Sequence, residues 1–214
     1  VNVGLWGPVG VGWTERYRSA GLNIGTPTNP TGSKAYGGFL AKLDFDQFDR
    51  LYDPTQGWGA QGSYFYAAGE GYDKADLDLR AAQHFGDYII HGRVRGAGSF
   101  TGTLPFYDAV ALGGFLNLSG FARNQIIGGS LTYGNVRLEK VVGKLPLGLR
   151  GDMRVGAALE GGKVNGRYTE TELNGWQSSV TAYVGGETPL GVVYLGYGYS
   201  PNGTGNFYLF IGTP

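Results

Sequence analysis

The sequence predicts an all-β fold, a transmembrane antiparallel β-barrel, and three observations lead to this prediction. Segments of about ten residues with alternating apolar and polar side chains recur along the chain, separated by turn residues. The 41 glycines, 15 tyrosines and 11 phenylalanines disfavour helix interiors and favour strands. No run of about 18 apolar residues is present that could form a membrane helix, so strands would have to cross the bilayer.

The segment 190–200 shows the alternation most clearly. From position 193, its odd-numbered positions carry Val, Leu, Tyr and Tyr, whereas its even-numbered positions from 192 carry Val, Tyr, Gly, Gly and Ser. Successive side chains of a strand point to opposite faces, so one face is apolar and the other is small and polar. We expect further strands at 10–24, 36–50, 57–70, 74–86, 87–100, 128–143, 147–161, 174–186 and 205–213, with a short piece at 1–7.

These segments predict one barrel domain over 1–214, with ten to twelve visible strands. Compact turns and longer polar connections alternate along the chain, and 101–127 is the longest connection. Outer-membrane barrels alternate short periplasmic turns with long extracellular loops in this way. A soluble β-sandwich does not require long loops at every second connection, so the alternation favours the membrane barrel.

Charged residues are sorted onto the face opposite the apolar one, which predicts a charged lumen. A lipid-facing arginine at the bilayer midplane would cost about 2–4 kcal/mol, so this sorting is expected of a barrel. A soluble antiparallel sheet with one solvated face shows the same alternation in a single strand, but its repetition across most strands favours the barrel. The expected lumen charges are Asp44, Asp76, Asp78, Arg80, Arg93, Arg95, Asp152, Arg154 and Glu160.

Several functions are disfavoured by the sequence. The 17 basic and 17 acidic residues balance, so no nucleic-acid footprint is expected. His84 and His91 lack a convincing third ligand, and Asp44, Asp46 and Asp49 lack the glycine and distal glutamate of a calcium loop. Neither a Gly-x-Ser-x-Gly motif nor a cysteine is present. We therefore expect no enzyme, metal or cofactor, and we expect both histidines to be solvated in the lumen or at its rim.

Four stretches resemble one family of barrels. They are Ala-Leu-Gly-Gly-Phe-Leu-Asn-Leu-Ser-Gly-Phe-Ala-Arg-Asn-Gln-Ile-Ile-Gly at 111–128, Asp-Phe-Asp-Gln-Phe-Asp with Asp-Pro-Thr-Gln-Gly at 44–57, Val-Gly-Ala-Ala-Leu-Glu-Gly-Gly-Lys-Val at 155–164, and Asn-Phe-Tyr-Leu-Phe-Ile-Gly at 206–212. Together they resemble the bacterial surface-antigen superfamily of outer-membrane assembly proteins and two-partner secretion transporters. Within it they look most like the C-terminal barrel of patatin-like autotransporters. The resemblance implies a sixteen-stranded barrel, of which this chain would be the C-terminal part.

The resemblance also implies roles for particular residues. Leu118, Ser119, Gly120, Phe121 and Arg123 match the loop motif, whose tip folds into the lumen in that superfamily. Ser119 stands where many members carry an arginine that pairs with a carboxylate on a neighbouring strand, so either Arg123 or a hydrogen bond from Ser119 could take over this contact. The last strand, with Phe207, Leu209, Phe210 and Ile211, is of the type read by the barrel assembly machinery.

The function expected from these features is a translocator and membrane anchor for a passenger protein in the bacterial outer membrane. Its implied partners are the lipid bilayer, the assembly machinery and a passenger polypeptide such as a patatin-like phospholipase domain. A passive diffusion pore is the alternative, and a soluble β-sandwich binding module is a third hypothesis. A homodimer stays open as a way to cover free strand edges.

Overall fold

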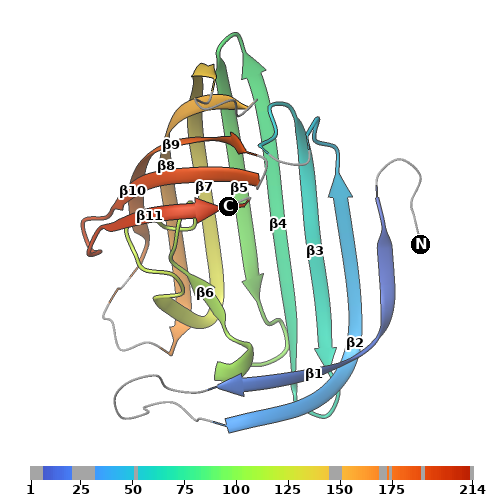
Figure 1. The fold of residues 1–214 in the computed structure, drawn as a ribbon. Coiled ribbons are helices and arrows are strands. Elements are labelled where there is room, and N and C mark those ends of the chain that lie inside the picture. The colour runs from blue at the N-terminus through green and yellow to red at the C-terminus, as the bar shows by residue number, and fades with distance from the viewer. Residues whose placement is uncertain are drawn as a thin grey trace.

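The computed structural model describes residues 7–20, 32–50, 53–144, 151–168, 173, 175–188 and 191–212. These residues form eleven strands and one turn of 3-10 helix, η1, at Phe106–Asp108 (Figure 1). The strands are β1 Val9–Ala20, β2 Gly32–Asp46, β3 Gly57–Ala67, β4 Tyr72–Phe85, β5 Tyr88–Gly98, β6 Val110–Leu112, β7 Ile126–Lys144, β8 Asp152–Arg167, β9 Gln177–Thr188, β10 Gly191–Tyr199 and β11 Asn206–Ile211. The short strand expected at 1–7 lies almost wholly outside the described residues.

All strands belong to one antiparallel sheet in which neighbours along the chain are neighbours in space. The order is β1-β2-β3-β4-β5-β7-β8-β9-β10-β11, and the short β6 pairs with β7 off this path. The sheet curls, and β6 with the loop around it lies on its concave side (Figure 1). No helix among the described residues is long and apolar enough to cross a membrane. The all-β antiparallel barrel fold is confirmed.

The two faces of the sheet differ as the alternation predicts. In β10, Val192 and Tyr194 are buried on the inner face, while Leu195, Tyr197 and Tyr199 are exposed on the outer face. The same outer face on the neighbouring strands exposes Val136, Leu159 and Phe207 among other large apolar side chains. Large exposed apolar surfaces of this kind mark a membrane or protein interaction.

Several boundaries differ from the sequence expectation, and the loop on the inner face explains the clearest one. The strand expected at 147–161 stops at Gly161, but β8 continues to Arg167 in register with β7. A Cβ atom at Gly162 would lie 2.7 Å from Leu112 Cδ1, so glycine here makes room for the loop. β2 also begins earlier, at Gly32, and the 101–127 connection contains η1 and β6.

The interior is filled by two clusters of buried side chains. The larger joins residues of β2–β5, β7 and β8 to loop residues such as Leu104, Leu118 and Phe121. The smaller surrounds Phe115, whose ring lies 5.5–5.6 Å, between ring centroids, from four aromatic rings of the wall. The four are Tyr183, Tyr194, Tyr208 and Phe210. The loop thus supplies core residues that the sheet alone lacks.

Replacing Leu159, exposed on the outer face of β8, by arginine should destabilise the protein in a bilayer by about 2–4 kcal/mol. The control is Gln83→Arg near the end of β4, where the cost should fall to about 0–1 kcal/mol, since an interfacial arginine reaches water. Denaturant unfolding in lipid vesicles measures both. Equal costs at the two positions would contradict a lipid-facing β8.

Candidate functional site

The tip of the loop between β6 and β7 is buried against the inner wall. Leu118, Ser119 and Phe121 have no exposed surface. Leu116 and Leu118 adopt φ values of 50° and 77°, which cost non-glycine residues roughly 1–2 kcal/mol each. Ser119 Oγ accepts a hydrogen bond from the Leu116 amide at 2.8 Å and closes the turn. Contacts to the wall must therefore stabilise this strained tip.

Glu160 of β8 provides the main contact. Its carboxylate accepts hydrogen bonds from Ser119 Oγ at 2.6 Å, the Leu118 amide at 2.6 Å and the Ser119 amide at 3.3 Å. Thr181 Oγ1 at 2.5 Å and the Tyr133 hydroxyl at 2.9 Å complete the set. Among the described residues no cation forms an ion pair with Glu160, so uncharged donors alone replace the water that this buried carboxylate loses.

This geometry places the loop contact at Ser119 and not at Arg123. Arg123 is exposed, and no hydrogen bond or ion pair of its side chain occurs within the described part of the chain. Of the two alternatives for the missing loop arginine, the structure therefore favours the serine hydrogen bond. The functional role of the contact stays a prediction.

Glycines let the tip approach the wall. A Cβ atom at Gly120 would lie 2.3 Å from Ser200 Cβ, and one at Gly198 of β10 would lie 2.3 Å from Ser119 Cβ. The Gly120 amide donates to Ser179 Oγ at 3.0 Å. The Tyr208 hydroxyl of β11 lies 2.8 Å from the Ser119 carbonyl. The tip therefore joins β8, β9, β10 and β11.

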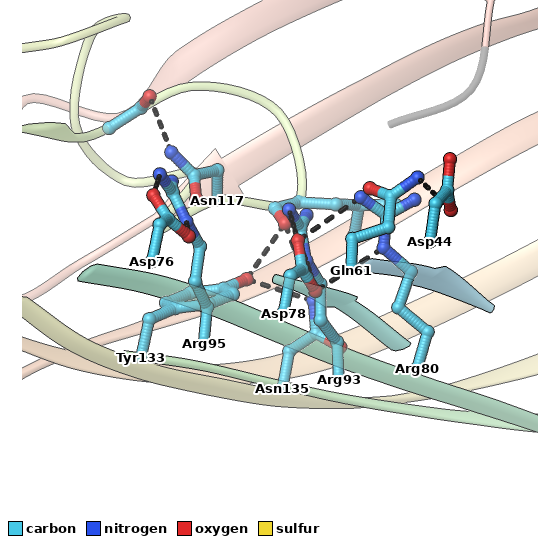
Figure 2. A network of polar contacts seen from close by, with 12 residues as sticks. Asp44, Gln61, Asp76, Asp78, Arg80, Arg93, Arg95, Asn117, Tyr133 and Asn135 are labelled. Carbon is cyan, nitrogen blue, oxygen red and sulfur yellow. Dashed lines mark hydrogen bonds and ion pairs between the residues drawn. The ribbon is translucent and has the colours of Figure 1, made fainter. Parts of the chain in front are cut away.

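The expected charges on β4 and β5 form ion pairs on the inner face (Figure 2). Asp78 lies 2.6 Å from Arg93 and 3.1 Å from Arg80, and Asp76 lies 2.6 Å from Arg95. Asp44 of β2 faces the same interior and accepts a hydrogen bond from Gln61 at 3.2 Å. Asp44, Asp78, Arg80 and Arg93 line a cavity of about 220 Å³.

A second network, which the sequence did not reveal as a unit, lies toward the end of the barrel that carries the short turns. Glu139 of β7 is 1% exposed and contacts His91 and Arg154, each at 3.2 Å. Arg154 also pairs at 2.9 Å with Asp53 of the β2–β3 turn. His91 is thus buried and bonded, contrary to the solvated position expected for it, whereas His84 is exposed.

Asp53 brings the β2–β3 turn across to β8 and β10. Its carboxylate lies 3.4 Å from the Tyr194 hydroxyl, and its backbone takes φ 52°. Burial raises the pKa of Asp53 to about 6, with a contribution from the nearby Glu139 charge. The charges of Arg154 and Arg137 and the hydrogen bond from Tyr194 oppose this increase without cancelling it.

Two groups of predicted residues lie elsewhere. Asp152 pairs with the largely exposed Lys144 at the strand ends, so it belongs to the rim and not to the lumen network. In β11, Phe207, Leu209 and Ile211 point outward and are 84%, 74% and 60% exposed, whereas Phe210 points inward onto Phe115. Recognition of this strand during assembly stays a prediction.

Glu139 could have been found from the sequence, because it shares the inward parity of Tyr133, Asn135 and Arg137 in β7. Asp53 could not, because turn residues carry no periodicity. The local hydrogen bonds of this turn do not show that it folds inward either. Asp49 accepts hydrogen bonds from the Thr55 and Gln56 amides at 2.9 and 3.0 Å, and these bonds could form in a turn facing either way.

The fold is similar to that of a solved crystal structure. The crystal structure of BamA from Haemophilus ducreyi lacking POTRA domains 1–3 matches with a TM-score of 0.68 and 13% sequence identity. The match covers 95% of this chain and 49% of that one, so the chain spans about half the length of the BamA structure. No protein-family model matches the sequence, and a search of curated proteins finds no match. The likeness confirms a transmembrane β-barrel fold.

The substitution Gly198→Ala should weaken docking of the loop. Its methyl group would lie 2.4 Å from the Ser119 carbonyl oxygen, so either β10 or the tip has to move, at about 1–3 kcal/mol. Gly96→Ala on β5 is the matched control, because no atom would lie within 4 Å of the added methyl group. Unfolding free energy and the rate of proteolysis within 113–125 measure the effect. Similar results for both variants would contradict a tightly docked tip.

Acidification should stabilise the wild-type protein relative to Asp53→Asn. The pKa of Asp53 is about 6 in the folded state against an ordinary value of 3.8, so the folded state binds the proton first as the pH falls. The gain in unfolding free energy is fully present below the pKa of Asp53 in the unfolded chain, and it is lost as the pH rises through about 6. It amounts to at most about 3 kcal/mol. Urea unfolding of both proteins between about pH 4 and pH 7.5 checks this. A constant difference between them would refute it.

Proposed function

We propose that this chain is a translocator barrel of the outer membrane, related to the surface-antigen superfamily, that anchors and exports a passenger polypeptide. The observation that carries the proposal is the docked loop tip, whose Ser119 and Leu118 bind the Glu160 carboxylate inside the barrel. The likeness to BamA supports the membrane and assembly setting of the proposal.

The interior chemistry supports a plugged channel. The tip and Phe115 occupy the space in front of β8–β11, while Asp53 holds the β2–β3 turn against Arg154 at the other end. A cavity of about 220 Å³ lined by charges of both signs lies beside them. Because the loop fills the space in front of β8–β11, export requires the loop to leave its site.

The outer face and the edge strands of the sheet suggest the partners of the protein. The outward apolar side chains fit the acyl chains of a bilayer. The outward Phe207, Leu209 and Ile211, on a strand at one edge of the sheet as described, fit recognition by strand addition. A patatin-like phospholipase domain is the passenger that the sequence resemblance suggests. A homodimer through the edge strands β1 and β11 is a further proposal.

Conductance in planar bilayers tests the proposal. We expect the intact protein to show low conductance with rare openings, and a variant lacking 101–127 to form a stable, wide pore. A wide, steadily open pore in the intact protein would support the passive diffusion pore instead.

An export assay on the same two proteins distinguishes a loop that takes part in export from a loop that only blocks the channel. In cells, a passenger fused to the chain should become accessible to added protease when the loop is intact. Loss of export in the deletion variant, with the barrel still folded and inserted, is expected for a loop that takes part in translocation. Conductance changes without any surface passenger in either protein would contradict the translocator.

A further inference from the structure

The loop has a second attachment, far from Glu160, at η1. The carboxylate of Asp108 is 2% exposed and lies among side chains of β1, β2 and β4. Two tyrosine hydroxyls lie 3.1 Å from its Oδ2 atom. Three cations lie 3.2, 3.2 and 3.6 Å from its oxygens. The two hydroxyls are those of Tyr36 and Tyr72. The cations are Arg16 and Lys74, each at 3.2 Å, and Arg18 at 3.6 Å.

All five donors belong to the wall, and the loop supplies the acceptors, which are the Asp108 carboxylate and, for Lys74 at 2.7 Å, the Asp108 backbone carbonyl. The Arg16 guanidinium lies 3.5 Å from the centroid of the Phe65 ring, which fixes its plane by cation–π contact. Tyr36 packs edge-on against Phe65 and Tyr72, at 6.0 and 6.3 Å between ring centroids. Contacts within the wall therefore orient Arg16, Tyr36 and Tyr72 whether or not Asp108 is present.

Among the residues that the structure describes, the charges of this cluster do not balance. Asp108 neutralises one of the three cations, and the neighbouring Lys34 is already paired with Glu70. The side chains of Arg16 and Lys74 are only 18% and 19% exposed, so their excess charge is costly. At Glu160, by contrast, uncharged donors alone hold the loop. Holding the loop thus does not require three cations.

We propose that Arg16, Arg18, Tyr36, Tyr72 and Lys74 form a binding site for a small oxyanion of the phosphate type, which Asp108 fills as an internal ligand. Arginine and lysine donors with two hydroxyls match the several acceptor oxygens and the double charge of a phosphate. The half-exposed Arg18 gives the site an opening to solvent. This site exists independently of the proposed export function.

An oxyanion in this site competes with the loop. Binding displaces Asp108 and frees the η1 end of the loop, while the tip keeps its bonds to Glu160. The concentration of phosphate then shifts the population of the partly released loop, because ligands shift equilibria by their differential affinity. The direct consequence is measurable without a passenger.

Binding of inorganic phosphate to Asp108→Ala tests the site. In detergent micelles at constant ionic strength set with chloride, titration calorimetry should show phosphate binding at least about tenfold tighter than to wild type, whose own carboxylate competes. The control adds Arg16→Gln, Arg18→Gln and Lys74→Gln to Asp108→Ala and should lose this binding. Equal affinities for Asp108→Ala and either comparison protein would overturn the proposal.

A second measurement leaves Asp108 in place. The chain has no cysteine, so Ala109→Cys creates a single labelling position beside η1. Phosphate should increase its labelling by a water-soluble maleimide, whereas chloride at equal ionic strength should not. An unchanged rate at phosphate concentrations well above the affinity found for Asp108→Ala would show that no competition takes place, and would overturn the proposal.

Discussion

The arrangement of the interior depends on one buried carboxylate, that of Glu160. A carboxylate removed from water must find other donors, or its desolvation becomes a large penalty. Tyr133 and Thr181 supply two of them from the wall, and the loop tip supplies three through Leu118 and Ser119. The hydrogen-bonding capacity of Glu160 in the wall is therefore satisfied only when the loop is inside the barrel. This couples the position of the loop to the stability of the sheet.

The inner surface of β8–β11 is shaped to accept this loop. Glycines stand where the tip and the aromatic rings come closest, for example Gly198 beside Ser119 and Gly156 beside the Tyr183 ring. Tyrosines fill the remaining space and direct hydroxyls at loop carbonyls, as Tyr208 does. On the inner face, the pattern of small and large residues therefore reflects two constraints. One is the alternation of side chains along a strand, and the other is the shape of the loop that packs against it.

Sequence periodicity predicted much of this arrangement and failed where periodicity ends. The strands and the inward direction of Asp78, Arg93 and Glu160 follow from a two-residue repeat, because parity fixes the face of a side chain. The expected end at 161 was wrong for β8, since a glycine that ends a strand and one that makes room for a neighbour, as Gly162 does, cannot be told apart in the sequence. Asp53 and Asp108 lie in connections, where no repeat predicts which wall a side chain will meet.

The two loop carboxylate contacts differ in a way that bears on how the interior could open. At the tip, the wall provides the carboxylate and the loop provides neutral donors; at η1, the loop provides the carboxylate and the wall provides cations. Withdrawing the tip leaves Glu160 short of donors, and withdrawing η1 leaves three cations without a counter-charge. An incoming anion relieves only the second defect. An oxyanion therefore offsets the electrostatic cost of releasing η1, because a soluble ion can replace Asp108, whereas Glu160 still needs the neutral donors that the tip provides.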